Sequence, residues 1–257
     1  MVHHGFTNVN FVVAVSRPEK RLPQVENNKI TRNRGHGILY SGSDGVVVSR
    51  NTISHNNKHG IVLTRPAEIT IQDNNITFNN YSGISVYLGV CCTVQGNGIY
   101  HNKEHGMQTA GVGIIKENDI FGHQMSAIYV KMQGDPHVTR NRLQGIQQEC
   151  LHVEEGTRGL IEQNEIHHYS FVNPVYLHAD SQMQVKGNKF IVLIKQDNDG
   201  LETAIDLEYL NLQQPAARPL LNLNQDNRGP FFTSPTHKGN GADTRKNITI
   251  SRLCVIL

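Results

Sequence analysis

The sequence has no tryptophan, and only 6% of its residues are aromatic and 18% are charged. It also has little that would mark a membrane span. The apolar run near the amino terminus, residues 11–15, has five residues, whereas a spanning helix needs about 20. The net charge is +2 with the 14 histidines neutral, and no basic face or acidic tail stands out. We therefore do not expect nucleic acid as a partner.

Cysteine is scarce as well, with four residues in the chain: Cys91, Cys92, Cys150 and Cys254. Four cysteines in 257 residues, two of them adjacent, form neither a disulfide framework nor a CxxC zinc motif. We therefore expect a reducing, cytoplasmic environment and no metal site built on cysteine.

Asparagine and glycine are abundant instead, and they recur at a fixed interval. A motif of the Asn-x-Ile type occurs eight times, with steps of 23, 23, 23, 21, 23, 23 and 24 residues. Its asparagines are Asn28, Asn51, Asn74, Asn97, Asn118, Asn141, Asn164 and Asn188. In the first four copies a glycine follows nine residues later, at Gly37, Gly60, Gly83 and Gly106, and an apolar residue follows each glycine.

Each unit of about 23 residues holds three short β-like segments separated by turns, without the 3.6-residue apolar stripe of a helix. This pattern predicts an all-β fold, a right-handed parallel β-helix of about seven to eight coils, in which stacked coils hydrogen-bond to one another. We expect each repeated asparagine to adopt the left-handed conformation and to bond the next amide in a structural ladder. The glycines would allow positive φ and close approach of the chain.

The domain organisation follows from where the repeat begins and ends. We expect an irregular segment or partial coil at 1–24, the β-helix at 25–198, a C-terminal cap at 199–228 and a flexible tail at 229–257. Within the cap, Leu201–Leu212 would be an amphipathic helix or an edge strand that protects the last open coil.

The residues after each corner glycine should alternate inward and outward. The predicted inward stack is Ile38, Ile61, Ile84, Met107, Ile128, Leu151 and Val175. The outward row would be Leu39, Val62, Ser85, Gln108, Tyr129, His152 and Tyr176, with Lys131, Glu154 and His178 two residues further on. We interpret Tyr129, Lys131, His152, Glu154, Tyr176 and His178 as a candidate partner-binding face. An ordinary solvated sheet face with stacked aromatic residues is the alternative.

Catalytic carboxylates are not predicted, although parallel β-helices often cleave or bind polysaccharides. Such sites need clustered carboxylates for calcium or for acid–base work. The outward acids do not fall at repeat positions that give a tight cluster of three; they are Asp135, Glu154, Glu155 and Asp180. We therefore expect a protein that is not an enzyme.

Histidine gives no clear metal site either. His36, His59 and His105 each precede a corner glycine, but Ser82 interrupts the row. Two histidines without a third ligand make a weak metal site. A ladder of turn histidines is the better interpretation.

The chain ends in Cys-Val-Ile-Leu after a polar stretch, which fits the C-a-a-X prenylation pattern with geranylgeranyl on Cys254. A final strand with its aliphatic residues facing a core is the alternative. One prenyl chain gives marginal membrane binding, and Arg245, Lys246 and Arg252 are a modest second signal. Apart from this covalent lipid, no cofactor is expected.

The Asn-x-Ile coils over residues 25–198, followed by the Cys-Val-Ile-Leu ending, resemble the F-box only protein 10/11 family. The resemblance implies a substrate receptor of an SCF-type (Skp1–cullin–F-box) ubiquitin ligase, whose β-helix presents a target such as an apoptosis regulator while a partner E2 performs the chemistry. It also implies prenyl-dependent delivery to membranes, including the mitochondrial outer membrane, through Cys254. The sequence departs from the family because no F-box precedes the coils, so Skp1 and cullin would bind only through a segment absent here.

Three functions therefore stay open. The first is a non-enzymatic recognition module that binds a protein target and is cytoplasmic with prenyl-dependent membrane association. The second is a pectin-lyase-like carbohydrate-active enzyme or a carbohydrate-binding β-helix. The third is a scaffold with no target of its own.

Overall fold

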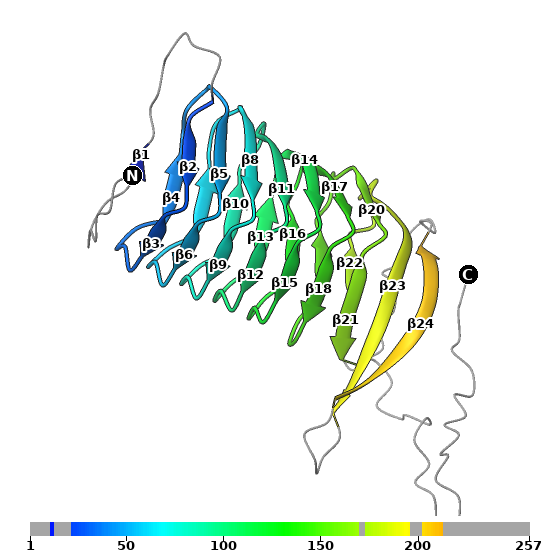
Figure 1. Cartoon of the computed structure of the whole chain (residues 1–257). Helices are drawn as coiled ribbons and strands as arrows, with labels where there is room; N and C mark the ends of the chain where they lie inside the picture. The colour runs from blue at the N-terminus through cyan, green and yellow to red at the C-terminus, as the bar shows by residue number, and fades with distance from the viewer. Residues whose placement is uncertain (1–10, 13–21, 170–172, 196–201, 213–257) are drawn as a thin grey trace, which may run out of the picture. The chain divides into compact units, whose positions relative to one another are not determined.

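The computed structural model describes residues 11–12, 22–169, 173–195 and 202–212, and it places side chains over 22–169 and 173–193 (Figure 1). All regular secondary structure in these residues is β-strand. Each coil contributes one strand to each of three rows, and strands from successive coils pair in parallel. The all-β parallel β-helix that the repeat predicts is thus confirmed.

The first row is an eight-stranded sheet. Its strands are β1 (Phe11–Val12), β4 (Ile38–Tyr40), β7 (Ile61–Leu63), β10 (Ile84–Val86), β13 (Met107–Thr109), β16 (Ile128–Val130), β19 (Leu151–Val153) and β22 (Val175–Leu177). The second row contains β2 (Gln24–Glu26), β5 (Val46–Ser49), β8 (Glu68–Gln72), β11 (Cys91–Gln95), β14 (Val112–Lys116), β17 (Asp135–Thr139) and β20 (Leu160–Glu162). The third contains β3 (Lys29–Thr31), β6 (Thr52–Ser54), β9 (Asn75–Thr77), β12 (Gly98–Tyr100), β15 (Asp119–Phe121), β18 (Arg142–Gly145) and β21 (Glu165–Tyr169).

Two long strands follow the last coil, and Figure 1 shows them in yellow and orange. β23 (Gln184–Lys195) pairs with both β20 and β21 and so joins the second and third rows into one sheet. β24 (Glu202–Leu212) pairs antiparallel with β23. Of the two structures expected for residues 201–212, the strand is therefore the one observed. Residues 213–257, with the predicted tail and Cys254, lie outside the described residues.

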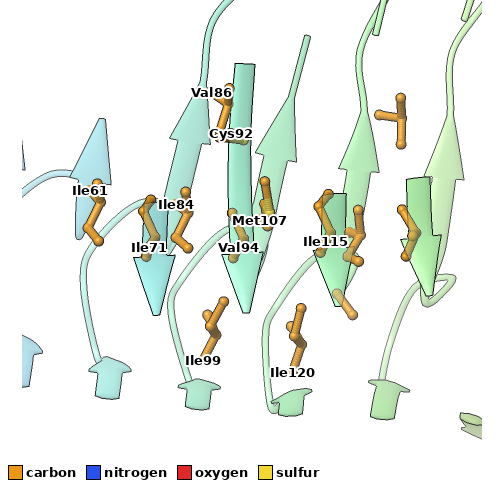
Figure 2. Packing of buried hydrophobic residues seen from close by; sticks show 14 of the residues in the cluster. Ile61, Ile71, Ile84, Val86, Cys92, Val94, Ile99, Met107, Ile115 and Ile120 are labelled. Carbon is orange, nitrogen blue, oxygen red and sulfur yellow. The ribbon is translucent and has the colours of Figure 1, made fainter. Parts of the chain in front are cut away.

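The core consists of the inward side chains of all three rows. In the first row the strands stay in strict register, so Ile61, Ile84 and Met107 stack on one another and are fully buried (Figure 2). The other members of the predicted inward stack, from Ile38 to Val175, are buried as well. Every coil thus buries the apolar side chains that it could not cover alone.

The corner glycines are required by close approach of the chain. A Cβ atom on Gly60 would lie 2.6 Å from the backbone oxygen of Gly83 and 2.6 Å from Cγ2 of Ile76. None of the four corner glycines has a positive φ, so that part of the expectation was wrong. Adjacent coils leave no room for a side chain at this position.

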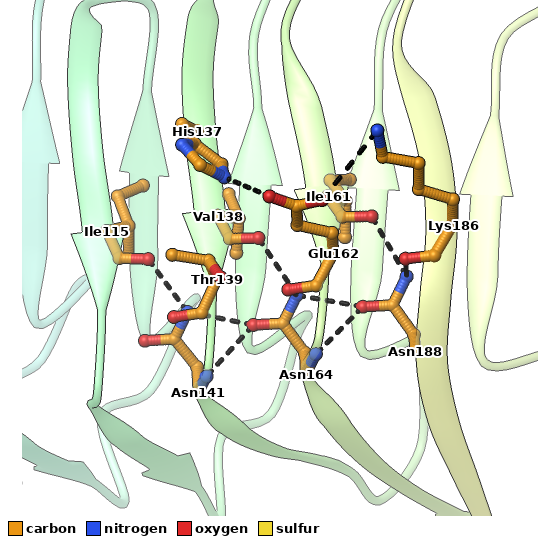
Figure 3. Close-up of polar contacts among 10 residues, drawn as sticks. All are labelled: Ile115, His137, Val138, Thr139, Asn141, Ile161, Glu162, Asn164, Lys186 and Asn188. Atoms are coloured by element: carbon orange, nitrogen blue, oxygen red, sulfur yellow. Dashed lines mark hydrogen bonds and ion pairs between the residues drawn. The ribbon is translucent and has the colours of Figure 1, made fainter. Parts of the chain in front are cut away.

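The repeated asparagines form a continuous hydrogen-bonded ladder. Asn74 donates from its backbone N–H and its Nδ2 to Oδ1 of Asn97, at 2.9 and 3.0 Å. Its Nδ2 also donates to the oxygens of Val48 and Gln72, both at 2.9 Å. Figure 3 shows the same pattern at Asn141, Asn164 and Asn188, beside the His137–Glu162 contact.

The left-handed residue of this turn is the one before the asparagine and not the asparagine itself. Asp73, for example, has a φ of 55° and precedes Asn74. The expectation of a left-handed asparagine was therefore off by one position. The side chain of the asparagine instead holds this turn by accepting and donating hydrogen bonds to the adjacent coils.

A second ladder runs at the following turn, and the sequence analysis missed it. Asn56 donates to Oδ1 of Asn79 at 2.9 Å, and Asn79 donates to Oδ1 of Asn102 at 2.9 Å. His123 takes the next place and accepts the backbone N–H of Asn102 at 3.1 Å. The signal was available, because these asparagines follow the first set by five residues in each coil.

Candidate functional site

The second half of the predicted outward row forms a ladder of rings on strands β16, β19 and β22. Tyr129 lies opposite His152, and His152 lies opposite Tyr176. The ring centroids are 5.0 Å apart for the first pair and 4.6 Å for the second. His105 from the corner of an earlier coil stacks on Tyr129 at 4.6 Å. It extends the ladder by one ring, although its position before a corner glycine predicts only a turn histidine.

Three members in the first half of the row, Val62, Ser85 and Gln108, are buried. Val62 and Ser85 are each 2% exposed, and Gln108 is buried. Gln108 donates to Oγ of Ser85 at 2.9 Å, which satisfies two of the polar groups buried in this part of the row. Leu39 at the start of the row is half-buried, as are Tyr129 and His152, and Tyr176 is the exposed member of the row.

Glu154 is fixed beside Tyr129 by two hydrogen bonds. The Tyr129 hydroxyl donates to Oε1 of Glu154, and the backbone N–H of Met132 donates to Oε2 at 2.7 Å. Desolvation, followed by the hydrogen bond to the Glu154 carboxylate, raises the pKa of Tyr129 to about 12. Desolvation alone would raise the pKa of Glu154, but the bonds from Tyr129 and Met132 outweigh it and lower that pKa. Glu154 is therefore an ionised acceptor that holds the turn after β19 against the turn after β16.

Lys131 lies over the same tyrosine, with its Nζ 5.8 Å from the ring centroid of Tyr129. No carboxylate among the described residues forms an ion pair with this ammonium group within 4 Å. Its contact with the protein is a cation–π interaction, which leaves its donors for a ligand.

His152 is oriented by an acidic partner on its own coil. Its Nδ1 contacts Oε1 of Glu149, and both groups are partly buried. Desolvation tends to raise the pKa of Glu149, but the hydrogen bond with His152 outweighs that effect and lowers it. Because Nδ1 is engaged, Nε2 is the ring nitrogen of His152 that can meet a ligand.

The turns after β19 and β22 bring three titratable groups together. Glu155, His178 and Asp180 each place one ligand atom within 4.8 Å of the others. The backbone N–H of Asp180 donates to Nδ1 of His178 at 3.2 Å. Only two of the four outward acids, Glu155 and Asp180, belong to this group, and its third member is a histidine. The repeat positions did not predict this proximity, because Glu155 and Asp180 lie in turns beyond the strands.

The turn histidines are stacked structural groups. The rings of His36 and His59 are parallel, with centroids 5.4 Å apart, and Tyr81 packs on His59 at 5.2 Å. Nδ1 of His59 accepts the backbone N–H of Ser82 at 3.0 Å. Desolvation lowers the pKa values of His36 and His59 to about 4. They are neutral near pH 7 and serve the packing of the corner.

The chain belongs to the right-handed β-helix family, because the model of that family matches residues 13–123 and 126–205. No curated protein sequence matches it. Among solved structures, the A-module of the mannuronan C-5 epimerase AlgE4 from Azotobacter vinelandii is similar, with a TM-score of 0.51 and 14% sequence identity. The aligned part covers 65% of this chain and 59% of the epimerase module. This chain therefore spans about three fifths of the length of that module. At this identity the likeness establishes the fold.

Three cysteines lie within the described residues, and all three are free thiols. Cys91 is exposed, whereas Cys92 and Cys150 are buried. Desolvation raises the pKa of both buried thiols to about 12, so neither is a reactive thiolate near pH 7. The described part of the chain contains no helix of the length and hydropathy that crossing a bilayer requires.

Proposed function

We propose that this chain is a recognition module that binds a protein partner through the face formed by Tyr129, Lys131, His152, Glu154, Tyr176 and His178. The observation that carries the proposal is the in-register ladder of Tyr129, His152 and Tyr176, the last of which is 39% exposed. Aromatic side chains held by neighbouring coils lose little conformational freedom on binding.

In its finer form, the proposal is that this module belongs to a substrate receptor of an SCF-type ubiquitin ligase of the F-box only protein 10/11 type. The β-helix would present a target such as an apoptosis regulator for ubiquitination by a partner E2. Geranylgeranylation of Cys254 would deliver the chain from the cytoplasm to a membrane. The sequence resemblance supports this form, and the β-helix is the architecture it requires.

The recognition proposal is tested by affinity capture with the whole chain, using Tyr129→Ala/Tyr176→Ala as the face variant and Phe78→Ala as the control. Phe78 is an exposed aromatic residue that directly follows β9 in the third row of strands. We expect a protein retained in stoichiometric amount by the wild type and the control and lost with the face variant. Equal capture by all three would contradict the proposal, as would a wild type that retains no protein.

The lipid is tested separately by the intact mass of the chain produced in eukaryotic cells. Geranylgeranylation predicts an added C20 prenyl group with loss of the last three residues and carboxymethylation. An unmodified mass would exclude the lipid without affecting the recognition face.

A second candidate function is a carbohydrate-active β-helix that binds or cleaves an acidic polysaccharide. The observation that favours it is the Glu149–His152 pair next to the Tyr129 ring, over which Lys131 lies, because general acid–base sites are built from such groups. The fold likeness to an epimerase module is consistent with it. Turnover of a polyuronate that is lost in His152→Gln would favour this candidate over the recognition module. Absence of turnover by the wild type would exclude the catalytic form of this candidate.

A further inference from the structure

The face formed by Tyr129, Lys131, His152, Glu154, Tyr176 and His178, called the recognition face here, is most exposed at its end in the last described coil. Tyr176 is the last ring of the ladder and the most exposed, and Met132 in the turn after β16 is 48% exposed. Around them are four carboxylates, those of Glu149, Glu154, Glu155 and Asp180, and two cationic groups, those of Lys131 and of the exposed Arg158 in the same loop as Glu155. With the histidines neutral, this region carries a net charge of −2, although the whole chain is at +2.

The two outer carboxylates are uncompensated. No lysine or arginine among the described residues forms an ion pair with Glu155 or Asp180, and the contact of Asp180 is with His178, Nδ1 to Oδ2 at 3.8 Å. Several acids on other coils do have such partners: Asp119 pairs with Arg142 at 2.6 Å and Glu117 with Arg140 at 3.0 Å. The face therefore has an excess of negative charge close to its most exposed aromatic residue, Tyr176.

Resting on the recognition function proposed above, we propose that the partner of this face is a basic linear segment, with arginine as its anchoring residue. A guanidinium between Glu155 and Asp180 would neutralise both carboxylates, and its planar surface can stack on the ring of Tyr176. Met132 offers an apolar contact for the stem of the same side chain. The charge pattern thus selects basic sequences and repels acidic ones.

The experiment measures binding of a fluorescein-labelled arginine–serine repeat peptide to the whole chain by fluorescence anisotropy. A glutamate–serine peptide of equal length is the counter-probe. We expect saturable binding of the basic peptide alone, weakened at least tenfold in Glu155→Gln/Asp180→Asn and weakened by added salt. Glu68→Gln is the control, because Glu68 is an exposed acid on β8 that forms no ion pair within the described part. It should bind like the wild type.

Three results would overturn the inference: equal binding of both peptides, no effect of the double variant, or no binding of the basic peptide. Calcium alone is a further arm, because the same atoms have the ligand types for a divalent cation. Saturable calcium binding without peptide binding would also overturn it. A captured protein could depend on Tyr129 and Tyr176 but not on Glu155→Gln/Asp180→Asn. That result would support the recognition function and contradict only the preference for a basic partner.

Discussion

At the scale of single residues, His123 shows how one side chain replaces another within a repeat. It stands where the preceding coils carry asparagine, accepts the N–H of Asn102 through Nδ1 and donates from Nε2 to the oxygen of Ile99 at 3.1 Å. This arrangement requires a neutral ring. Desolvation lowers the pKa of His123 to about 4, which is the direction expected for a buried base.

His123 should therefore make the stability of the chain depend on pH. The folded pKa is below the unfolded value of 6.5, so its contribution is fully present above about pH 6.5 and is lost as the pH falls toward about 4. That contribution is on the order of 3 kcal/mol. We expect His123→Asn to flatten the fall in unfolding free energy between pH 7 and 5, measured by urea titration. An unchanged pH dependence in this variant would contradict the assignment.

Corner glycines and turn glycines should respond differently to substitution. Gly83→Ala places a Cβ 2.6 Å from Cγ2 of Ile99 and 2.7 Å from the backbone oxygen of Gly106, so we expect a loss of about 3 kcal/mol or more. Gly187→Ala meets no atom within 4 Å and only has to keep a φ of 59°, which costs about 1 kcal/mol. Thermal unfolding of both variants tests the difference, and equal losses would refute the close-approach explanation.

At the scale of elements, the 23-residue period was enough to place three strands per coil and the inward stack. It did not reveal which residue of each turn is left-handed, because Asp73, Arg50 and Glu117 carry no shared chemical signature. Nor did it place Glu155 beside Asp180, since the path of a turn depends on packing between coils. The burial of Val62 and Ser85 was not predicted either. Strand alternation predicts the direction in which a side chain points, but not how much of that side chain its neighbours cover.

The asparagine ladder should be least tolerant in its middle. Asn97 accepts two hydrogen bonds from Asn74 and donates to Ile71, Gln95 and Asn118, and it is 1% exposed. Its replacement by alanine leaves several buried groups unpaired, so we expect a loss of about 3 kcal/mol or more.

Asn28 provides the matched comparison, because it lies at the first rung and its side chain donates only to Glu26 within the described residues. Asn28→Ala should cost about 1 kcal/mol or less. Denaturant titration of the two variants measures the loss of unfolding free energy in each. A ladder that contributes nothing to stability would give the same small loss in both.

At the scale of the whole molecule, the repeat makes a prediction about coil number. Removal of residues 74–96 joins Asp73 to Asn97 and deletes one full period, so the remaining coils keep their register. We expect this deletion to retain the β-sheet circular dichroism spectrum and a cooperative unfolding transition. Removal of residues 74–85 breaks the register and should abolish both. If the two deletions behave alike, stacking in register is not what specifies the fold.

At this scale we propose that the stacked coils support one binding face. The most direct test of this proposal is site-specific photo-crosslinking in cells, with p-benzoylphenylalanine in place of Tyr176 and, as the control, in place of Phe78. Both residues are exposed aromatics, Tyr176 in the middle of β22 and Phe78 directly after β9. We expect a discrete protein adduct from position 176 and none from position 78. The same adducts from both positions, or none from position 176, would contradict it.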